Sequence, residues 1–194
     1  MQLKQLEQLS GFSYPTVAGS LKKIESFLRR HSDRRVELNS FPRDEWFRLI
    51  ANSDNIRVPL GFFANRPRSV EDLIGRLTEK SVKDVAVSGI IGAHHYLPGI
   101  DLIGIPRLDL TVHNWSIRKV EDYVRKLDPG LKRAAAGEIS QVVVHNLYRP
   151  ESFFIKKEDY FIADEVECLM DLHEARLETQ ALELLDHLKR ESKR

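Results

Sequence analysis

The sequence contains a single cysteine, Cys168, among its 194 residues. One cysteine cannot form an intrachain disulfide, and this usage is typical of a reducing compartment, so a cytoplasmic location is predicted. Cys168 lies between apolar helix positions, where a free cysteine behaves as a small apolar side chain. We therefore predict a packing role for this residue rather than a nucleophilic one.

Long hydrophobic runs are also missing. No apolar stretch approaches the length of a membrane span, and the N-terminal residues lack the apolar region of a signal peptide. No membrane partner is therefore predicted. The 42% hydrophobic and 30% charged residues are ordinary for a globular protein, and a chain of 194 residues allows one or two domains.

The common catalytic and metal-binding motifs are missing too. The chain contains no CxxC or HxxxH spacing, no Gly-Lys-Ser/Thr phosphate loop and no GxSxG motif. His94 and His95 are adjacent, and neighbouring residues on a helix point about 100° apart, so they cannot easily bind one ion together. Neither a metal nor a cofactor is predicted.

One segment faintly resembles the metal site of nucleotidyltransferases, in which a Gly-Ser turn precedes two carboxylates one residue apart on a strand. Here the turn is Ser88-Gly89 and the strand begins Arg107-Leu108-Asp109, so a cation stands where the first carboxylate should be. Asp101 lies six residues before Arg107, too far away to replace that carboxylate on the same strand. The chain is therefore not expected to be an enzyme, and a degenerate nucleotidyltransferase-like protein is kept as an alternative.

The first thirty residues have the spacing of a helix-turn-helix. Leu3, Leu6 and Leu9 form an apolar stripe on a first helix, which is expected to stop at Gly11, where a left-handed C-cap costs glycine little. The Ser13 hydroxyl is expected to cap a second helix. A proline two residues later falls in the first turn, where its missing N–H is not needed.

The second helix is expected to have two distinct faces. Val17, Leu21, Ile24 and Leu28 recur at i, i+4, i+7 and i+11, which defines the buried face. Short hydroxyls near the start of such a helix can reach base edges in the major groove, and lysines further along supply charge contacts. The candidate DNA-reading residues are Ser13, Tyr14, Thr16, Ser20, Lys22 and Lys23.

A basic hairpin is predicted next, over residues 27–41. Two short strands around a polar turn at His31 to Asp33 form the wing of a winged helix. From Met1 to Arg35, seven Lys and Arg stand against three Asp and Glu, a net charge of +4, whereas the whole chain carries +1. DNA binding is therefore predicted for this end, with a repurposed interaction module as the alternative. The wing residues predicted to hold phosphates are Arg29, Arg30, Arg34 and Arg35.

The rest of the sequence predicts a second domain at residues 56–194, after a DNA-binding domain at residues 1–55. A helix carrying Trp46, Phe47 and Ile50 is expected to bridge the two domains. Beyond it, short strands alternate with serine-capped helices, and two amphipathic helices close the chain. The mixed connections favour an α+β (mixed α/β) fold, with an N-terminal winged helix-turn-helix followed by a mixed-sheet domain with C-terminal helices. Strands are expected within 57–64, 84–89, 107–114, 140–148 and 152–163, and helices within 69–80, 91–97, 116–127 and 164–190.

Three segments resemble the AbiEi-type antitoxins of type IV toxin-antitoxin systems. That family combines a winged helix, a strand-turn-helix of the form A-(V/L)-S-G-x-x-(A/G)-A, and a closing helix with a DLxxxR pattern. The corresponding segments here are LSGFSYPTVAGSLKKIE, AVSGIIGAHHYLPG at Ala86 to Gly99, and Ala163 to Lys189. Asp171, Leu172 and Arg176 match the last pattern.

The resemblance implies a repressor of its own toxin-antitoxin operon, with double-stranded operator DNA as its partner. It also implies a functional link to a nucleotidyltransferase-like toxin, which need not involve a stable complex. Where related regulators often place Arg in the recognition helix, this chain has Gly19. An alternative function is a winged-helix regulator whose second domain binds a small effector in a pocket lined by His94, His95, Tyr96 and His113.

Overall fold

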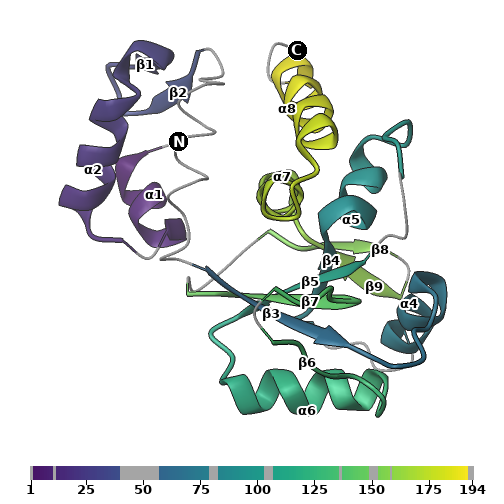
Figure 1. Ribbon diagram of the computed structural model, residues 1–194. Coiled ribbons are helices and arrows are strands. Elements are labelled where there is room, and N and C mark those ends of the chain that lie inside the picture. The colour runs from purple at the N-terminus through teal and green to yellow at the C-terminus, as the bar shows by residue number, and fades with distance from the viewer. Residues whose placement is uncertain are drawn as a thin grey trace.

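The computed structural model describes residues 2–10, 12–39, 57–78, 83–102, 107–135, 137–148, 153–157 and 159–191. Figure 1 shows two helices and a hairpin at the N-terminal end, followed by a sheet with helices on both faces. The expected stop at Gly11 and the expected helix with Trp46, Phe47 and Ile50 lie outside the described residues. Within the described ranges, no helix combines the length and apolar character needed to cross a membrane.

Two N-terminal helices are present, but the second is shorter than the sequence predicts. α1 (Leu3–Ser10) and α2 (Tyr14–Lys23) form the helical pair. The prediction that the second helix continues to Leu28 is wrong, because a 3-10 turn, η1 (Glu25–Phe27), follows α2. The turn redirects the chain so that Leu28 pairs with Leu38 in a strand. Strand pairing then satisfies the backbone groups that a longer helix would have satisfied.

The predicted hairpin follows directly. β1 (Leu28–Arg30) and β2 (Val36–Leu38) pair antiparallel. In the turn between them, the N–H of Arg34 donates to the carbonyl of His31 at 3.1 Å, and Arg34 has a φ of 65°. A left-handed residue after a tight turn suits the twist of a hairpin, although glycine is the residue that adopts it most easily.

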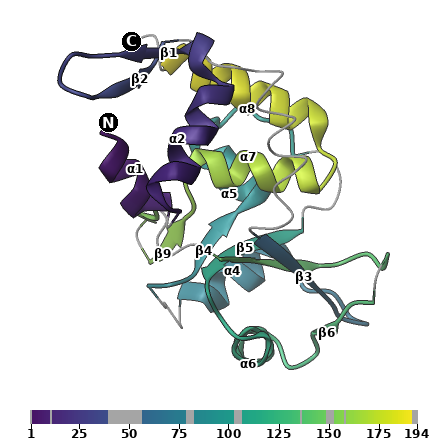
Figure 2. The same cartoon turned by 90° about the vertical axis from the view of Figure 1, so that its left-hand side faces the viewer.

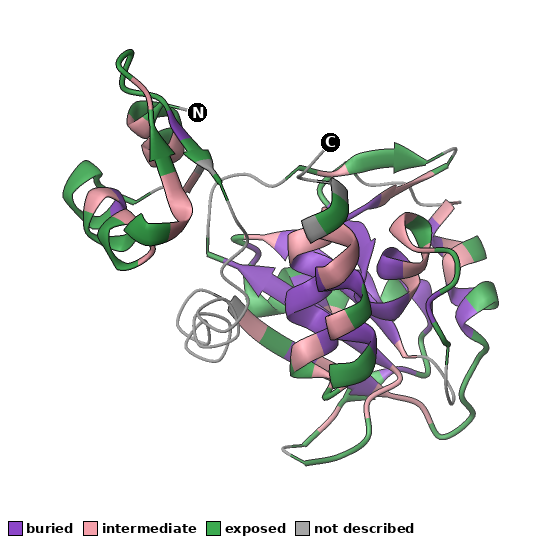
Figure 3. Cartoon of the chain, turned by 90° about the horizontal axis from the view of Figure 1, so that it is seen from above, coloured by how far each residue is buried: buried purple, intermediate pink, exposed green. Residues whose placement is uncertain are grey.

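Most described side chains of this N-terminal module are exposed or half-buried (Figure 3). Among them, Val17 of α2 and Val36 of β2 are the buried apolar ones. A backbone bridge joins Gln2, before α1, to Arg35 at the base of the hairpin. Figure 2 shows the hairpin extending beyond the two helices.

The rest of the chain is built on a seven-stranded sheet with the order β6-β3-β7-β5-β4-β9-β8. β5 is parallel to β7 and β4 is parallel to β9, whereas the other neighbouring pairs are antiparallel. The mixed sheet confirms the predicted α+β class, although the sequence does not predict β6. The strands are β3 (Arg57–Phe63), β4 (Ala86–Ser88), β5 (Leu108–His113), β6 (Lys132–Arg133), β7 (Val142–Leu147), β8 (Ile155–Lys157) and β9 (Tyr160–Ile162).

Helices cover both faces of the sheet. α4 (Val70–Thr78) and α6 (Ile117–Leu127) pack on one face, where alternate residues of β3, β5 and β7 complete an apolar core. α5 (Gly89–Tyr96), α7 (Glu165–Glu174) and α8 (Glu178–Glu191) form a second core on the other face. Figure 3 shows that buried residues concentrate in the sheet and in the helices that cover it.

Capping residues define several helix ends. Ser69 Oγ accepts from the N–H of Asp72 at 3.1 Å, and Ser116 Oγ accepts from the N–H of Lys119 at 3.2 Å, so both predicted serine caps are confirmed. α7 ends at Glu174, and Arg176, two residues later, has a left-handed backbone with a φ of 58°. This end turns the chain sharply into α8 and leaves the last turn of α7 above the sheet.

Candidate functional site

All ten side chains predicted to contact DNA are exposed. They lie on α2, in the turn before it and on the β1–β2 hairpin, so each of them can reach a partner in solution. These exposed residues are Ser13, Tyr14, Thr16, Ser20, Lys22, Lys23, Arg29, Arg30, Arg34 and Arg35.

A residue of α1 caps the N-terminus of α2. Ser13 occupies the predicted N-cap position, but its hydroxyl makes no cap bond and lies 3.0 Å from Thr16 Oγ1. The N–H of Tyr14 donates instead to Glu7 Oε1 at 3.0 Å. The predicted hydroxyl cap is therefore wrong. The positive end of a helix favours an anionic acceptor, and the packing of α1 on α2 brings one within reach.

Glu7→Gln is expected to strengthen DNA binding without unfolding the module. The amide oxygen can still accept from the Tyr14 N–H, while one negative charge beside the candidate reading helix is removed. Affinity for any duplex is expected to rise about threefold to fivefold, the size of one screened charge contact. Fluorescence anisotropy measures this change, and Glu71→Gln on the exposed side of α4 is the matched control. An equal rise in both variants would show that only net charge matters.

Two of the four hairpin arginines are paired with acidic neighbours. Arg30 Nε lies 3.2 Å from Glu25 Oε1, and Arg35 Nε lies 2.6 Å from Asp33 Oδ2. The Asp33 carboxylate also accepts from the backbone N–H of Arg35, and these bonds lower the pKa of Asp33. Because both partners of each ion pair are exposed, the two pairs are weak, and Arg30 and Arg35 can exchange them for contacts with phosphate.

The remaining basic residues of the module differ in how close they lie to acidic side chains. Arg29 lies opposite Glu37 in the hairpin, so its positive charge is partly offset. Across the described ranges, no ion pair joins an acidic side chain to Lys22, Lys23 or Arg34. These last three residues are therefore the charges most available to a phosphate backbone.

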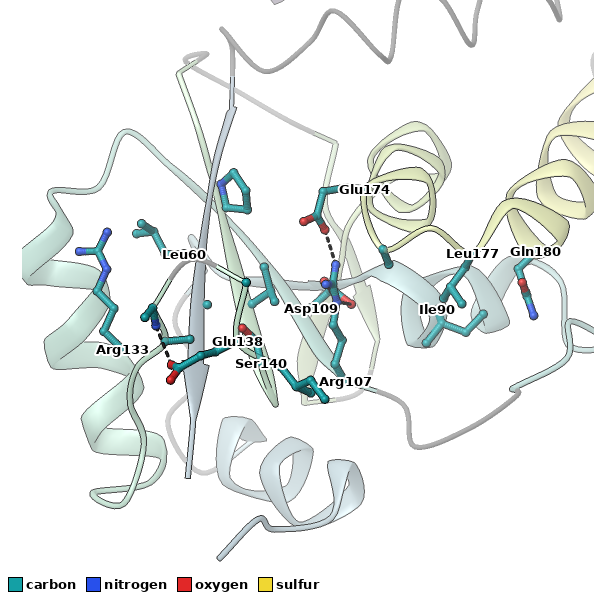
Figure 4. A pocket seen from close by; sticks show the side chains of 18 of the residues that line it. Leu60, Ile90, Arg107, Asp109, Arg133, Glu138, Ser140, Glu174, Leu177 and Gln180 are labelled. Carbon is teal, nitrogen blue, oxygen red and sulfur yellow. Dashed lines mark hydrogen bonds and ion pairs between the residues drawn. The ribbon is translucent and has the colours of Figure 1, made fainter. Parts of the chain in front are cut away.

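A cleft of about 640 Å³ opens on the sheet face that carries α5, α7 and α8. Strands β3, β5 and β7 contribute its base, and the junction of α7 with α8 and the loop after β6 form its walls (Figure 4). Its volume lies in the range of small-molecule sites. Residues that line it include Ile90, Arg107, Asp109, Glu138, Glu174 and Gln180.

The residues expected to line an effector pocket do not line this cleft. The Tyr96 hydroxyl donates to the carbonyl of Ala163 at 2.8 Å, and its ring meets that of His95 edge-on at 5.1 Å. His113 lies against Phe154, with 5.0 Å between the ring centroids. These side chains make packing contacts, so the cleft found here is a different one from the pocket that the sequence predicts.

Charged side chains meet at the base of the cleft. Arg107 donates from Nε to Asp109 Oδ1 at 3.0 Å and Oδ2 at 3.2 Å, and from Nη2 to Glu174. His145 Nε2 lies 2.8 Å from Asp109 Oδ1, and His145 Nδ1 lies 3.3 Å from Asp171 Oδ1. We call these residues the charged cluster: Arg107, Asp109, His145, Asp171 and Glu174.

The charged cluster is buried on its sheet side and open on its cleft side. The side chains of Asp109, His145 and Asp171 are at most 2% exposed, whereas Arg107 is 23% and Glu174 is 37% exposed. Burial opposes the ionisation of Asp109, but the hydrogen bond with His145 and the charge of Arg107 outweigh it. The pKa of Asp109 therefore lies below its usual value, and an ionised carboxylate sits at the base of the cleft.

Gly89 allows the sheet and α5 to pack closely around Asp109. It has a φ of 59°, and a Cβ at this position would lie 2.4 Å from Asp109 Oδ2. The Ser88-Gly89 turn and the Arg107-Leu108-Asp109 segment, both noticed in the sequence, are therefore neighbours in the fold. Asp101 lines the same cleft.

Sequence reasoning finds only part of the charged cluster. Arg107 and Asp109 stand out by their spacing, and Asp171 lies in the segment that resembles the DLxxxR pattern of AbiEi-type antitoxins. The other two members carry weaker signals. His145 is a polar residue in the apolar strand VVVHNL, and Glu174 lies three residues after Asp171 on an amphipathic helix.

Comparisons with known proteins assign no family to this chain. No family model matches it, and no curated protein matches it. The chain is similar to the crystal structure of the Megavirus polyadenylate synthase, with 15% identity and a TM-score of 0.34, over 90% of this chain and 37% of that one. The chain thus spans well under half the length of that protein, and a likeness of this size identifies neither a family nor an activity.

Proposed function

We propose that the chain is a DNA-binding transcriptional regulator that contacts duplex DNA through α2, the turn before it and the β1–β2 hairpin. The observation that carries the proposal is the exposure of all ten predicted contact residues on one small module. The segment from Met1 to Arg35, which contains this module apart from β2, carries a net charge of +4. Such a surface attracts the phosphate backbone of any sequence.

The outer face of α2 supports major-groove binding. Val17 is buried against the rest of the module, while Thr16, Ser20 and Lys23 are exposed. Their spacing of four and then three residues places these three side chains on one face of the helix. In this arrangement the two hydroxyls face base edges and the lysine at the end of the helix faces a phosphate.

The hairpin supports a contact with the DNA backbone. The Gln2–Arg35 bridge ties its base to the residue before α1, and Arg34 lies in its turn. A left-handed backbone costs a residue with a side chain about 1–2 kcal/mol, a cost that glycine does not have. The fold alone would favour glycine at this position, so the presence of Arg34 supports a role for its positive charge in binding.

The DNA in this proposal is the operator of the chain's own toxin-antitoxin operon. Its support is the resemblance of the helix-turn-helix segment, of Ala86 to Gly99 and of the C-terminal helices to AbiEi-type antitoxins. The protein would then act in the cytoplasm and counteract a nucleotidyltransferase-like toxin, which need not involve a stable complex. No catalytic step is proposed, because β5 offers a single carboxylate and Arg107 binds it.

Fluorescence anisotropy of the full chain tests the proposal on its own upstream duplex and on a scrambled duplex of equal length. Wild-type protein is expected to bind the upstream duplex more tightly and to lose affinity for both as salt rises. Thr16→Ala is expected to reduce the preference for the upstream duplex by about 1–3 kcal/mol while leaving the scrambled duplex unaffected. Ser26→Ala, an exposed hydroxyl outside the predicted reading face, is the control.

Two results would count against these assignments. Equal losses on both duplexes for Thr16→Ala would show that this side chain does not read bases. Absence of wild-type binding to either duplex would overturn the proposal and favour a protein-interaction role for the module.

A further inference from the structure

We propose that Asp109, His145 and Glu174 form a divalent-metal site whose cation position is held by the Arg107 guanidinium, so that a metal ion and Arg107 compete for it. This inference concerns the second part of the chain and does not depend on DNA binding. It assigns a chemical role to the charged cluster, which the proposed function does not use.

The three side chains present suitable atoms at a suitable spacing. One oxygen of Asp109, one ring nitrogen of His145 and one oxygen of Glu174 all lie within 4.8 Å of one another. Two carboxylates and an imidazole form a donor set that Zn²⁺ and related divalent ions accept. The cleft provides an entry path, because Asp109 and Glu174 both line it.

Arg107 occupies the position that a metal ion would take. Its Nε binds both oxygens of Asp109, and its Nη2 binds Glu174, so one cation joins the two carboxylates. Its side chain is partly exposed at the cleft, so the guanidinium can turn outward when another cation enters (Figure 4).

His145 is oriented as in many metal sites. Its Nδ1 faces Asp171 at 3.3 Å, and its Nε2 faces the carboxylate of Asp109. A carboxylate beside one ring nitrogen favours a proton on that nitrogen and leaves the lone pair of the other nitrogen for a metal. Asp171 would therefore act as a positioning residue for His145 rather than as a ligand.

Isothermal titration of the chelator-treated full chain with Zn²⁺ tests the competition. Arg107→Met is expected to bind one equivalent at least about tenfold more tightly than wild type, because the competing cation is gone. Glu174→Gln in the Arg107→Met background is expected to weaken that binding at least about tenfold. Glu138→Gln in the same background alters a carboxylate that lines the cleft outside the cluster, so affinity should not change.

Thermal unfolding with and without Zn²⁺ covers the case in which Arg107→Met folds poorly. A variant that regains a cooperative transition on adding Zn²⁺ supports the site, because an ion that binds only the folded state stabilises it. A variant that stays unfolded at saturating Zn²⁺ overturns the proposal. Equal affinity in wild type and Arg107→Met overturns it too, as does Zn²⁺ binding that Glu174→Gln does not weaken.

Discussion

Arg107→Met is expected to lower the free energy of unfolding by about 3–5 kcal/mol in the presence of a chelator. The side chain of Asp109 is 2% exposed, and Arg107 supplies its only guanidinium contact in the described ranges. Removing Arg107 leaves a buried carboxylate with His145 as its remaining hydrogen-bond partner in the charged cluster, and separates Glu174 of α7 from β5. Chemical denaturation measures the loss.

Arg118→Met is the matched control for this experiment. Arg118 lies on α6 with a side chain that is 91% exposed, and its ion pair with Asp122 spans 3.9 Å. A surface pair of this kind contributes about 0–1 kcal/mol, so the control should unfold close to wild type. A loss below about 1 kcal/mol in Arg107→Met would show that Asp109 does not need the guanidinium, and that its charge is balanced by other groups.

The triple variant Lys22→Ala, Lys23→Ala and Arg34→Gly is expected to show the largest effect on DNA binding. Each lost phosphate contact lowers the slope of log affinity against log salt by about 0.9, so three contacts lower it by about 2.7. Affinity should fall about a hundredfold or more at moderate salt, on specific and scrambled duplexes alike. Glycine at residue 34 suits the φ of 65°, so the turn is kept while its charge is removed.

A control variant with the same change in net charge distinguishes direct contacts with phosphate from the general attraction between a positively charged protein and DNA. Lys83, Lys132 and Lys156 are exposed residues of the second part of the chain, and their triple alanine variant also loses three positive charges. This variant should keep the wild-type salt slope. Equal slopes in the two triple variants would show that the N-terminal module is not the site of DNA contact.

Local sequence patterns were sufficient to predict most of the structural elements. Ser69 and Ser116 begin helices because each hydroxyl accepts from an N–H three residues later. The short strand-like runs at β5 and β7 predict these strands, and a polar turn flanked by arginines predicts the hairpin. These signals act over a few residues and do not require knowledge of the neighbouring elements.

Predictions failed where a distant part of the chain competed with a local signal. Ser13 had the spacing of a hydroxyl cap, yet the cap bond to Tyr14 comes from Glu7 on α1. Leu28 continued the helical periodicity of the second helix, yet it pairs with Leu38 across the hairpin. In both places a contact made on folding satisfied the backbone better than the local pattern did.

Apart from β6 and the 3-10 turn after α2, the order of the elements, the α+β class and the basic N-terminal module could be read from hydrophobic period, caps and charge, because these properties are local. The charged cluster could not be read from the sequence in this way. Arg107 and Glu174 are 67 residues apart, and Asp109 and His145 are 36 residues apart. They meet because the sheet places β7 beside β5 and because α7 packs above these strands together with α5 and α8. Strand order and helix packing depend on contacts across the whole fold, so only the tertiary structure revealed this site.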